Sequence, residues 1–241
     1  MAVADTVARP ARSDSTFFPT MAVAMTATVL LGFARSFYLK PVFHAPPDLS
    51  LLMVVHGVAF TAWMAVLVIQ TGFVATNRRD LHMKLGAFGA ALAALMVVLG
   101  TWLAIDALQR GFSPVAGVPA KMFFAIPLFD MLVFAGVATA GILNRRRTAW
   151  HKRFMILATV AMLDAAVARI PLGFIENGGP PVFFGLCDLF IVAVAWYDWS
   201  TLRRVHPATL WAGGAIVFSQ VFRLWLSGTD QWQSFAGLFL H

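Results

Sequence analysis

The sequence predicts an all-α integral membrane protein, a bundle of seven transmembrane helices, on the strength of three observations. Of its 241 residues, 60% are hydrophobic and 12% are charged, whereas soluble domains are about 45–50% apolar and about 25% charged. The apolar residues form long blocks, and most of the lysines and arginines lie between them. The sequence contains no phosphate-binding, dinucleotide-binding or hydrolase motif. The pattern therefore indicates a chain that is solvated by lipid.

Each apolar block is long enough to cross a bilayer. A hydrocarbon core of roughly 30 Å needs about 20 helical residues, and a helix satisfies its own backbone hydrogen bonds inside that core. The predicted helices span residues 17–39, 50–75, 85–105, 122–143, 154–174, 181–199 and 208–226. The domain organisation that follows is an N-terminal tail (1–16), one transmembrane domain (17–226) and a short amphipathic tail on the outer surface (227–241).

The lysines and arginines predict the orientation, because cytoplasmic loops are enriched in both. The N-terminal tail and the second, fourth and sixth connections share one side of the membrane. That side holds twelve of the 18 basic residues: Arg9, Arg12, Arg78, Arg79, Lys84, Arg145, Arg146, Arg147, Lys152, Arg153, Arg203 and Arg204. We therefore expect a cytoplasmic N-terminus and an external C-terminus, in a bacterial-type inner membrane. The net charge of +7 then reflects topology, and nucleic acid is not an expected partner.

Two features of the chain leave alternatives open. Residues 21–34 end in Gly32-Phe33-Ala34, which is also compatible with a signal-peptide cleavage site. The three cytoplasmic turns each combine arginines with a histidine that opens the next helix, at His82, His151 and His206. This recurrence indicates a leader helix followed by three related hairpins, although selection for positive cytoplasmic loops alone would produce similar turns.

Ionisable groups inside the predicted spans are the candidate functional residues, because such groups in a membrane are costly and usually paired, hydrated or functional. On helix 2, His56, Trp63 and Gln70 recur every seven residues and share one face. Three acids and three bases lie in the outer half of the bundle. The sequence predicts one polar ligand-binding cavity there, lined by Arg35, His56, Trp63, Asp130, Asp164, Arg169, Asp188, Gln220 and Arg223. Ion pairs that only hold helices together are the alternative.

Histidines offer a second candidate site. His82, His151 and His206 all lie at the cytoplasmic interface, where they would form a three-histidine metal site or supply axial ligands to haem. Their basic neighbours repel cations, so interfacial histidines without a ligand are the competing interpretation. The single cysteine, Cys187, rules out both an intramolecular disulfide and a cysteine-based metal site.

Several motifs resemble those of a known family. His56-Gly57, Asp80-Leu81-His82-Met83-Lys84-Leu85-Gly86, His151-Lys152-Arg153-Phe154-Met155 and His206-Pro207-Ala208-Thr209-Leu210-Trp211 are similar to segments of a family of bacterial multi-pass membrane proteins. That family has no established activity, so the resemblance implies the fold and no catalytic residue. The chain is also faintly similar to haem A synthase and related membrane haem proteins, but His82-Met83 stands where they have a His-Arg step.

Three functions are compatible with this pattern. The first expectation is that the cavity binds a small hydrophobic or redox molecule, such as a quinone, a lipid or haem, in a membrane redox or assembly role. The second is a proton-coupled carrier of a small solute, because carboxyl groups near a histidine are suited to proton handling. The third is a non-catalytic subunit of a larger membrane complex. No reaction is predicted, and the lipid bilayer is the one partner that the composition itself implies.

Overall fold

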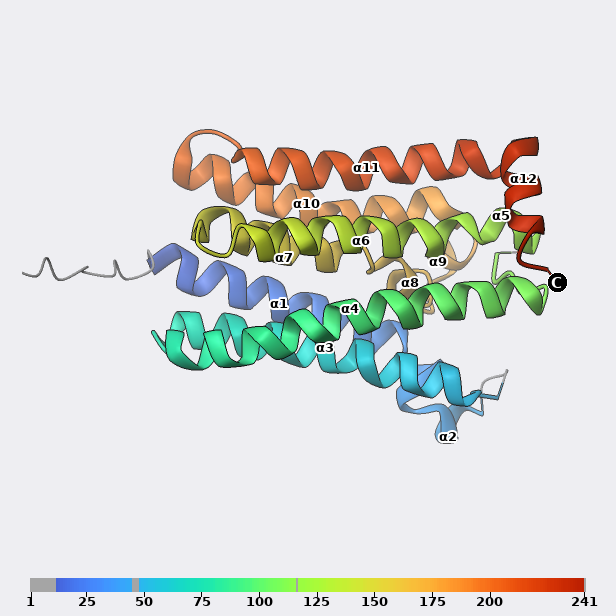
Figure 1. The fold of residues 1–241 in the computed structure, drawn as a ribbon, viewed down its shortest axis with the longest axis horizontal. Helices are drawn as coiled ribbons and strands as arrows, with labels where there is room; N and C mark the ends of the chain where they lie inside the picture. The colour runs from blue at the N-terminus through green and yellow to red at the C-terminus, as the bar shows by residue number, and fades with distance from the viewer. Residues whose placement is uncertain (1–11, 45–47, 116, 241) are drawn as a thin grey trace, which may run out of the picture.

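The protein is an α-helical bundle whose long helices run side by side (Figure 1). A computed structural model describes residues 12–44, 48–115 and 117–240, and within them there is no β-strand. The long helices are α1 (Arg12–Gly32), α3 (Leu51–Ala75), α4 (Arg79–Gln109), α6 (Ala125–Leu143), α7 (Thr148–Val160), α10 (Gly179–Leu202) and α11 (Pro207–Ser227). Short elements lie between them: the π-helical turn η1 (Ala34–Tyr38), α2 (Lys40–Phe43), α5 (Ala120–Phe123), α8 (Asp164–Val167), α9 (Gly173–Glu176) and α12 (Asp230–Gly237).

Five helices are long and apolar enough to cross a membrane, as the composition predicted. They are Ser13–Gly32, Leu51–Ala75, Arg79–Gln109, Ala120–Leu143 and Gly179–Leu202. Helix α11 has 21 residues and carries Gln220 and Arg223, and it is not one of these five. All-α architecture and a membrane-compatible surface are therefore confirmed.

The predicted fifth span, residues 154–174, is wrong as a single helix. Helix α7 stops at Val160, and tight i→i−3 bonds from Met162 N to Thr159 O and from Leu163 N to Val160 O, both 3.1 Å, close its last turn. Asp164 then opens the four-residue helix α8. Neither a proline nor a glycine lies between 154 and 168, so local sequence gives no signal for the break.

Helix α1 packs against the chain at this break, through Gly32 and Ala166. A Cβ atom added to Gly32 would lie 2.0 Å from the carbonyl oxygen of Ala166, so the backbones of α1 and α8 approach more closely than any other residue at position 32 would allow. The continuous apolar run predicted one helix, because the hydrophobic pattern of a segment carries no information about the helix that packs against it. Close packing by small residues is a common way for membrane helices to associate.

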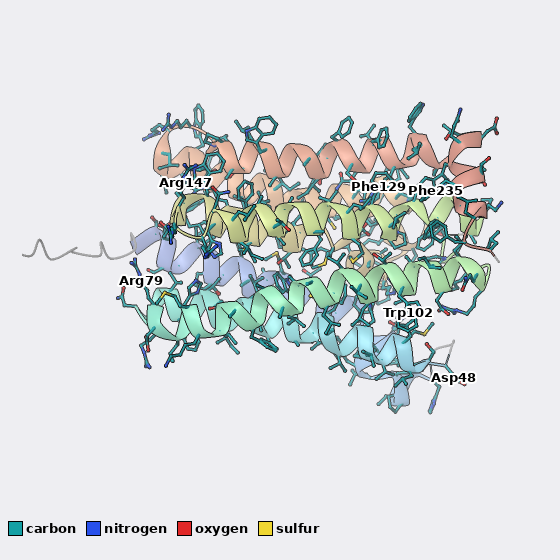
Figure 2. All side chains as sticks on the ribbon, viewed as in Figure 1. Asp48, Arg79, Trp102, Phe129, Arg147 and Phe235 are labelled. Atoms are coloured by element: carbon teal, nitrogen blue, oxygen red, sulfur yellow. The ribbon has the colours of Figure 1, made fainter. Side chains whose placement is uncertain are left out.

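The turns that carry the arginines all lie at one end of the bundle, which we call the basic end. The α3–α4, α6–α7 and α10–α11 turns are together there with the start of α1, whereas α2, α5 and α12 lie at the opposite end (Figure 1). Arg79 and Arg147 project at the basic end, far from Asp48 and Phe235 (Figure 2). The turns use left-handed backbone at Asn77, with φ of 59°, and at Arg203, with φ of 56°.

Helix α12 lies across the opposite end of the bundle (Figure 1), within the residues predicted as the C-terminal tail. Thr229 caps it by accepting a hydrogen bond from Trp232 N at 3.3 Å. Trp232 is buried against Phe124, and its Nε1 donates to the carbonyl oxygen of Lys121 at 2.7 Å. Leu238 remains exposed. The predicted N-terminal tail is shorter than expected, since α1 already begins at Arg12; residues 1–11 and His241 lie outside the described residues.

Candidate functional site

Three of the predicted site residues meet in the interior, from three different helices. Arg223 of α11 forms ion pairs with Asp130 of α6 and, from Nη2 to Oδ2 at 3.5 Å, with Asp164 at the start of α8. We call Asp130 and Asp164 the carboxyl pair. Two acids that would be negative in water therefore share one guanidinium.

The cluster is enclosed by protein. Asp130, Asp164 and Arg223 are 6%, 4% and 3% exposed. Arg223 Nη1 donates a further hydrogen bond to the carbonyl oxygen of Ile126 at 2.8 Å, and its guanidinium lies 4.4 Å from the centroid of the Phe184 ring, within cation–π distance. Asp164 Oδ1 accepts a hydrogen bond from the backbone of Ala165 at 2.7 Å. These contacts hold the three charged groups in one geometry.

The helix break is what brings Asp164 to this point. Since α7 ends at Val160, the backbone turns and presents Asp164 as the first residue of a new short helix, facing α6 and α11. The inward face of α11 carries Ser219, Gln220 and Arg223, all buried. Ser219 Oγ, Asp164 Oδ2 and Arg223 Nε are buried atoms without a hydrogen-bond acceptor or donor partner among the described residues.

Asp188 of α10 lies next to this cluster. It is partly buried, and it accepts a hydrogen bond from Gln220 Nε2 at 2.9 Å. Gln220 precedes Arg223 by three residues, one helical turn, so α11 contacts both acidic positions with a single face. Among the described residues, Asp188 has no ion-pair partner.

The remaining predicted cavity residues are directed elsewhere. Arg35 stacks over Phe43, 5.7 Å from its ring centroid, and Arg169 over Phe33 at 4.9 Å. Arg169 Nη1 donates to Ala165 O at 2.5 Å, and no ion pair joins it to an acid among the described residues. The expected balance of three acids and three bases in one cluster is therefore wrong, because helix rotation places Arg35 and Arg169 against aromatic rings.

Helix α3 contributes packing contacts at its polar stripe. His56 stacks on Phe60 with ring centroids 4.0 Å apart. Trp63 is 2% exposed, donates from Nε1 to Thr159 Oγ1 at 3.0 Å, and meets Phe134 edge-on. The stripe faces the bundle, as its spacing predicted, but in the described part of the chain no hydrogen bond or ion pair joins it to the carboxyl pair.

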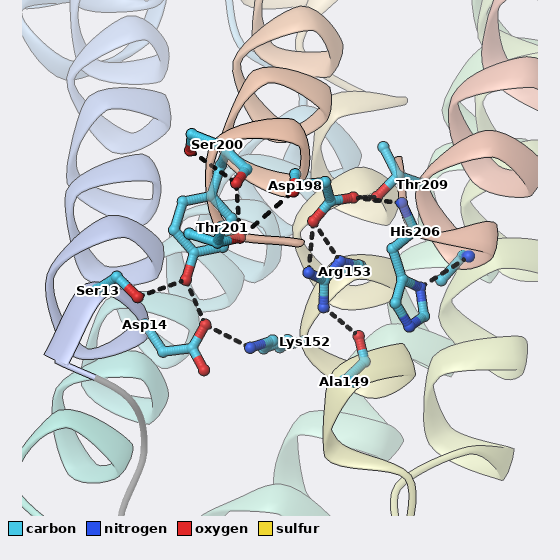
Figure 3. Close-up of polar contacts among 12 residues, drawn as sticks. Ser13, Asp14, Ala149, Lys152, Arg153, Asp198, Ser200, Thr201, His206 and Thr209 are labelled. Carbon is cyan, nitrogen blue, oxygen red and sulfur yellow. Dashed lines mark hydrogen bonds and ion pairs between the residues drawn. The ribbon is translucent and has the colours of Figure 1, made fainter. Parts of the chain in front are cut away.

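A second network of buried charge lies near the basic end and was missed by the sequence analysis (Figure 3). Asp198 of α10 is fully buried. Its carboxylate accepts from Arg153 Nε at 2.8 Å, from Thr209 Oγ1 at 2.6 Å and from the backbone of His206 at 3.0 Å, and Arg153 Nη2 completes the ion pair. Arg153 was counted as a loop charge. The available signal was Asp198 itself, an acid within the apolar run of predicted helix 6.

The same network anchors α1. Asp14 Oδ1 accepts from Lys152 Nζ at 2.5 Å and from the hydroxyl of Tyr197 at 2.5 Å (Figure 3). Phe17 stacks on the Tyr197 ring at 4.1 Å. Helices α1, α7, α10 and α11 are thus tied together at the basic end.

The three interfacial histidines do not form one site. His82 and His151 are neighbours, with ring centroids 6.1 Å apart, but His206 lies against Trp150 and its Nδ1 accepts a hydrogen bond from Ala208 N at 3.0 Å as the N-cap of α11. Among the described residues, no group of three or more His, Cys, Asp or Glu side chains is arranged to hold a metal ion. The three-histidine prediction is therefore wrong in its membership.

Comparisons of the chain with models of protein families, with curated proteins and with solved structures found no match. The motif resemblances thus stay predictions, and function has to be inferred from the residues and their geometry.

Proposed function

We propose that this chain is an integral membrane protein that crosses the bilayer seven times. Five helices have the required length and apolar character. Support for α11 comes from its surface: Trp211 and Trp225 are exposed near its two ends, about 21 Å apart at helical rise. Its polar residues Ser219, Gln220 and Arg223 all face inward. Exposed tryptophans near both ends of a helix are typical of the two membrane interfaces. The broken segment α7–α9 provides the seventh crossing.

The proposed orientation places the basic end in the cytoplasm. The turns at this end carry exposed arginines, at 78, 145–147 and 203–204, and cytoplasmic loops are the ones enriched in Lys and Arg. The N-terminus is then cytoplasmic, the C-terminal helix α12 lies on the outer surface, and the carboxyl pair lies in the outer half of the bundle. A bacterial-type inner membrane fits this distribution.

Within that frame, we infer that the protein is a proton-coupled carrier of a small solute. The observation that carries this proposal is that two buried carboxyl groups, those of Asp130 and Asp164, pair with the single guanidinium of Arg223. One guanidinium balances one carboxylate, so the second carboxyl group is the one that holds a proton. With that proton the cluster is neutral, and without it the cluster carries one negative charge in a low-dielectric interior.

The helix break supports the same function. Many secondary transporters build their substrate and ion sites where a membrane helix is interrupted. Here the interruption after Val160 lies directly beside the carboxyl pair, and Asp188 with Gln220 extends the polar face along α11. When a proton leaves the carboxyl pair, the net charge of the pair and Arg223 changes next to the break between α7 and α8. This change couples protonation to movement of the broken segment.

A second candidate function is supported by a different observation. An open groove of about 290 Å³ lies over α6, α7 and α11 and has an apolar lining that includes Val133, Phe154 and Trp211. Its size is near the lower limit of ligand sites, roughly 300–1,000 Å³. A quinone or lipid tail would fit its chemistry, in line with the first function expected from the sequence. It contains no charged group, so the carboxyl pair would then have only a structural role.

Infrared spectroscopy of the purified full-length protein tests the proton. The proposal expects a protonated carboxylic acid band that shifts in D₂O and disappears in both Asp130→Asn and Asp164→Asn. Asp106→Asn is the matched control, because Asp106 is one-third exposed and paired with Arg110 on the surface. If the band is absent from the wild type, or survives both substitutions, the carboxyl pair is an ordinary ionised cluster.

Proteoliposomes with a trapped pH-sensitive dye test the coupling. Small organic acids, amines and sugars are added one at a time under an imposed pH gradient. The proposal expects at least one solute to change proton flux in the wild type and in Asp106→Asn, and not in Asp164→Asn. Flux without any solute dependence would favour a proton pathway, and no flux in the presence of the infrared band would make the pair static.

A further inference from the structure

We propose that His82 and His151 bind a cuprous ion at the basic end of the bundle. The two residues come from different helices, α4 and α7, and their rings lie nearly perpendicular with centroids 6.1 Å apart. With metal–nitrogen distances of about 2.0 Å, one ion between two imidazoles places the ring centroids roughly 5–6 Å apart, the longer value for a linear arrangement. The observed spacing is therefore close to that of a two-coordinate site.

Each of the two rings has one nitrogen available to a ligand. His151 Nδ1 lies 2.8 Å from the carbonyl oxygen of Gly141, so Nδ1 is the protonated nitrogen and Nε2 keeps its lone pair. On His82, Nδ1 is a buried atom without a hydrogen-bond partner among the described residues. Histidines that bind metals usually donate their other ring N–H in this way, which sets the tautomer and the orientation of the ring.

Two further side chains line the same place. Gln70 Oε1 is a second buried atom without a partner, and Gln70 lies opposite Gly86, the residue one turn after His82. Met155 lies one turn after His151 on α7, and its Sδ is next to Gly141, the residue whose carbonyl holds the His151 ring. If the Met155 thioether joins the two neutral imidazoles, the three form a donor set that suits copper in its soft, monovalent state.

The positive charge around the two histidines also favours Cu⁺ over a divalent ion. The basic end carries Arg79, which acts electrostatically on His82, and the exposed arginines 145–147 of the neighbouring turn. A divalent ion held by neutral ligands would be repelled more strongly than a monovalent ion. Two imidazoles supply no negative charge, so Cu⁺ is the first-row ion that this site tolerates best. The site is separate from the carboxyl pair and does not depend on its function.

Copper binding by the full-length protein in detergent tests the inference. Under reducing conditions, competition with a chromogenic Cu⁺ chelator is expected to give one bound copper per chain. His82→Ala and His151→Ala should each weaken binding at least tenfold. His206→Ala is the matched control, because His206 lies at the same end but caps α11, and it should retain wild-type affinity. Thermal unfolding of each variant without copper identifies any that fail to fold.

X-ray absorption at the copper edge of the wild-type complex supplies a readout that folding does not affect. The proposal expects imidazole nitrogen scattering in the wild type, and a sulfur contribution that is lost in Met155→Leu. Binding of less than one copper per two chains, equal loss in His206→Ala, or spectra without imidazole scattering would overturn the proposal. Tighter binding of Zn²⁺ than of Cu⁺ would overturn the choice of ion.

Discussion

The Arg153–Asp198 ion pair offers the sharpest test of how this bundle is held together. Asp198 is completely buried and Arg153 is 2% exposed. Removing one partner of a buried pair leaves the other charge uncompensated and typically costs about 3–5 kcal/mol. Arg153→Met replaces the charged side chain by an unbranched apolar one, and Asp198→Asn keeps the shape of the acceptor. Each single substitution is therefore expected to lower the free energy of unfolding by about 3–5 kcal/mol.

The double variant is expected to lose much less stability than the two single variants lose together. In Arg153→Met/Asp198→Asn no buried charge remains, and the Asn oxygen still accepts from Thr209 or from the backbone of His206. Both Arg153–Asp198 hydrogen bonds disappear together with their partners. Two groups stay behind without a partner: the second donor, Thr209 or His206, and the carbonyl oxygen of Ala149, to which Arg153 Nη1 donates. At about 0.5–1.5 kcal/mol for each of these two groups, the total cost is about 1–3 kcal/mol. The two effects should then fall short of additivity by about 3 kcal/mol or more.

Equilibrium unfolding in mixed micelles, followed by circular dichroism, measures these differences. The surface pair Asp106 and Arg110, one-third exposed or more, provides the matched cycle, with a coupling of about 0.5 kcal/mol or less. Additive effects of Arg153→Met and Asp198→Asn, or single variants within about 0.5 kcal/mol of the wild type, would refute the claim that this pair is a buried, mutually dependent unit.

Three further predictions follow from the packing. Gly32→Ala should lower the thermal unfolding temperature by several degrees, because a Cβ atom there would lie 2.0 Å from the backbone of α8. Gly136→Ala is the control and should change this temperature little, because nothing lies within 4 Å of its Cβ position. Equal effects of the two substitutions would contradict the close approach of α1 and α8. Burial and the nearby Arg153 lower the pKa of His206 below 6.5. The unfolded chain therefore binds a proton at this residue first, and the stability of the fold should fall as the pH drops below about 6.5. In His206→Asn, which has an uncharged cap, the thermal unfolding temperature should depend less on pH in this range, and an unchanged dependence would contradict the prediction. Trp63→Phe removes a buried hydrogen bond to α7, which should lower the free energy of unfolding in mixed micelles by about 0.6 kcal/mol. The smaller ring also buries less apolar area, which adds somewhat to this loss. Trp102→Phe, on the exposed surface, should leave the free energy of unfolding unchanged.

The structure pairs three of the residues that the sequence analysis placed in one polar cavity. Asp130, Asp164 and Arg223 were expected to meet because an isolated charge inside a bilayer is unfavourable, and each needed a partner from another helix. Arg35 and Arg169 were assigned to the same cavity by the same argument. They instead lie over aromatic rings, an arrangement that depends on which face of each helix is turned inward, and the count of charges does not contain that information.

Apolar length and the distribution of Lys and Arg determined the class of this protein, its helices and the gathering of basic turns at one end, because a lipid solvent acts on each segment separately. Tertiary structure alone decided where the fifth segment breaks, that Arg153 reaches Asp198, and that His82 meets His151 without His206. These features depend on the order and rotation of helices around the bundle, and on the approach of Gly32 to α8. Contacts between segments far apart in the chain are properties of the packing, and no local pattern records them.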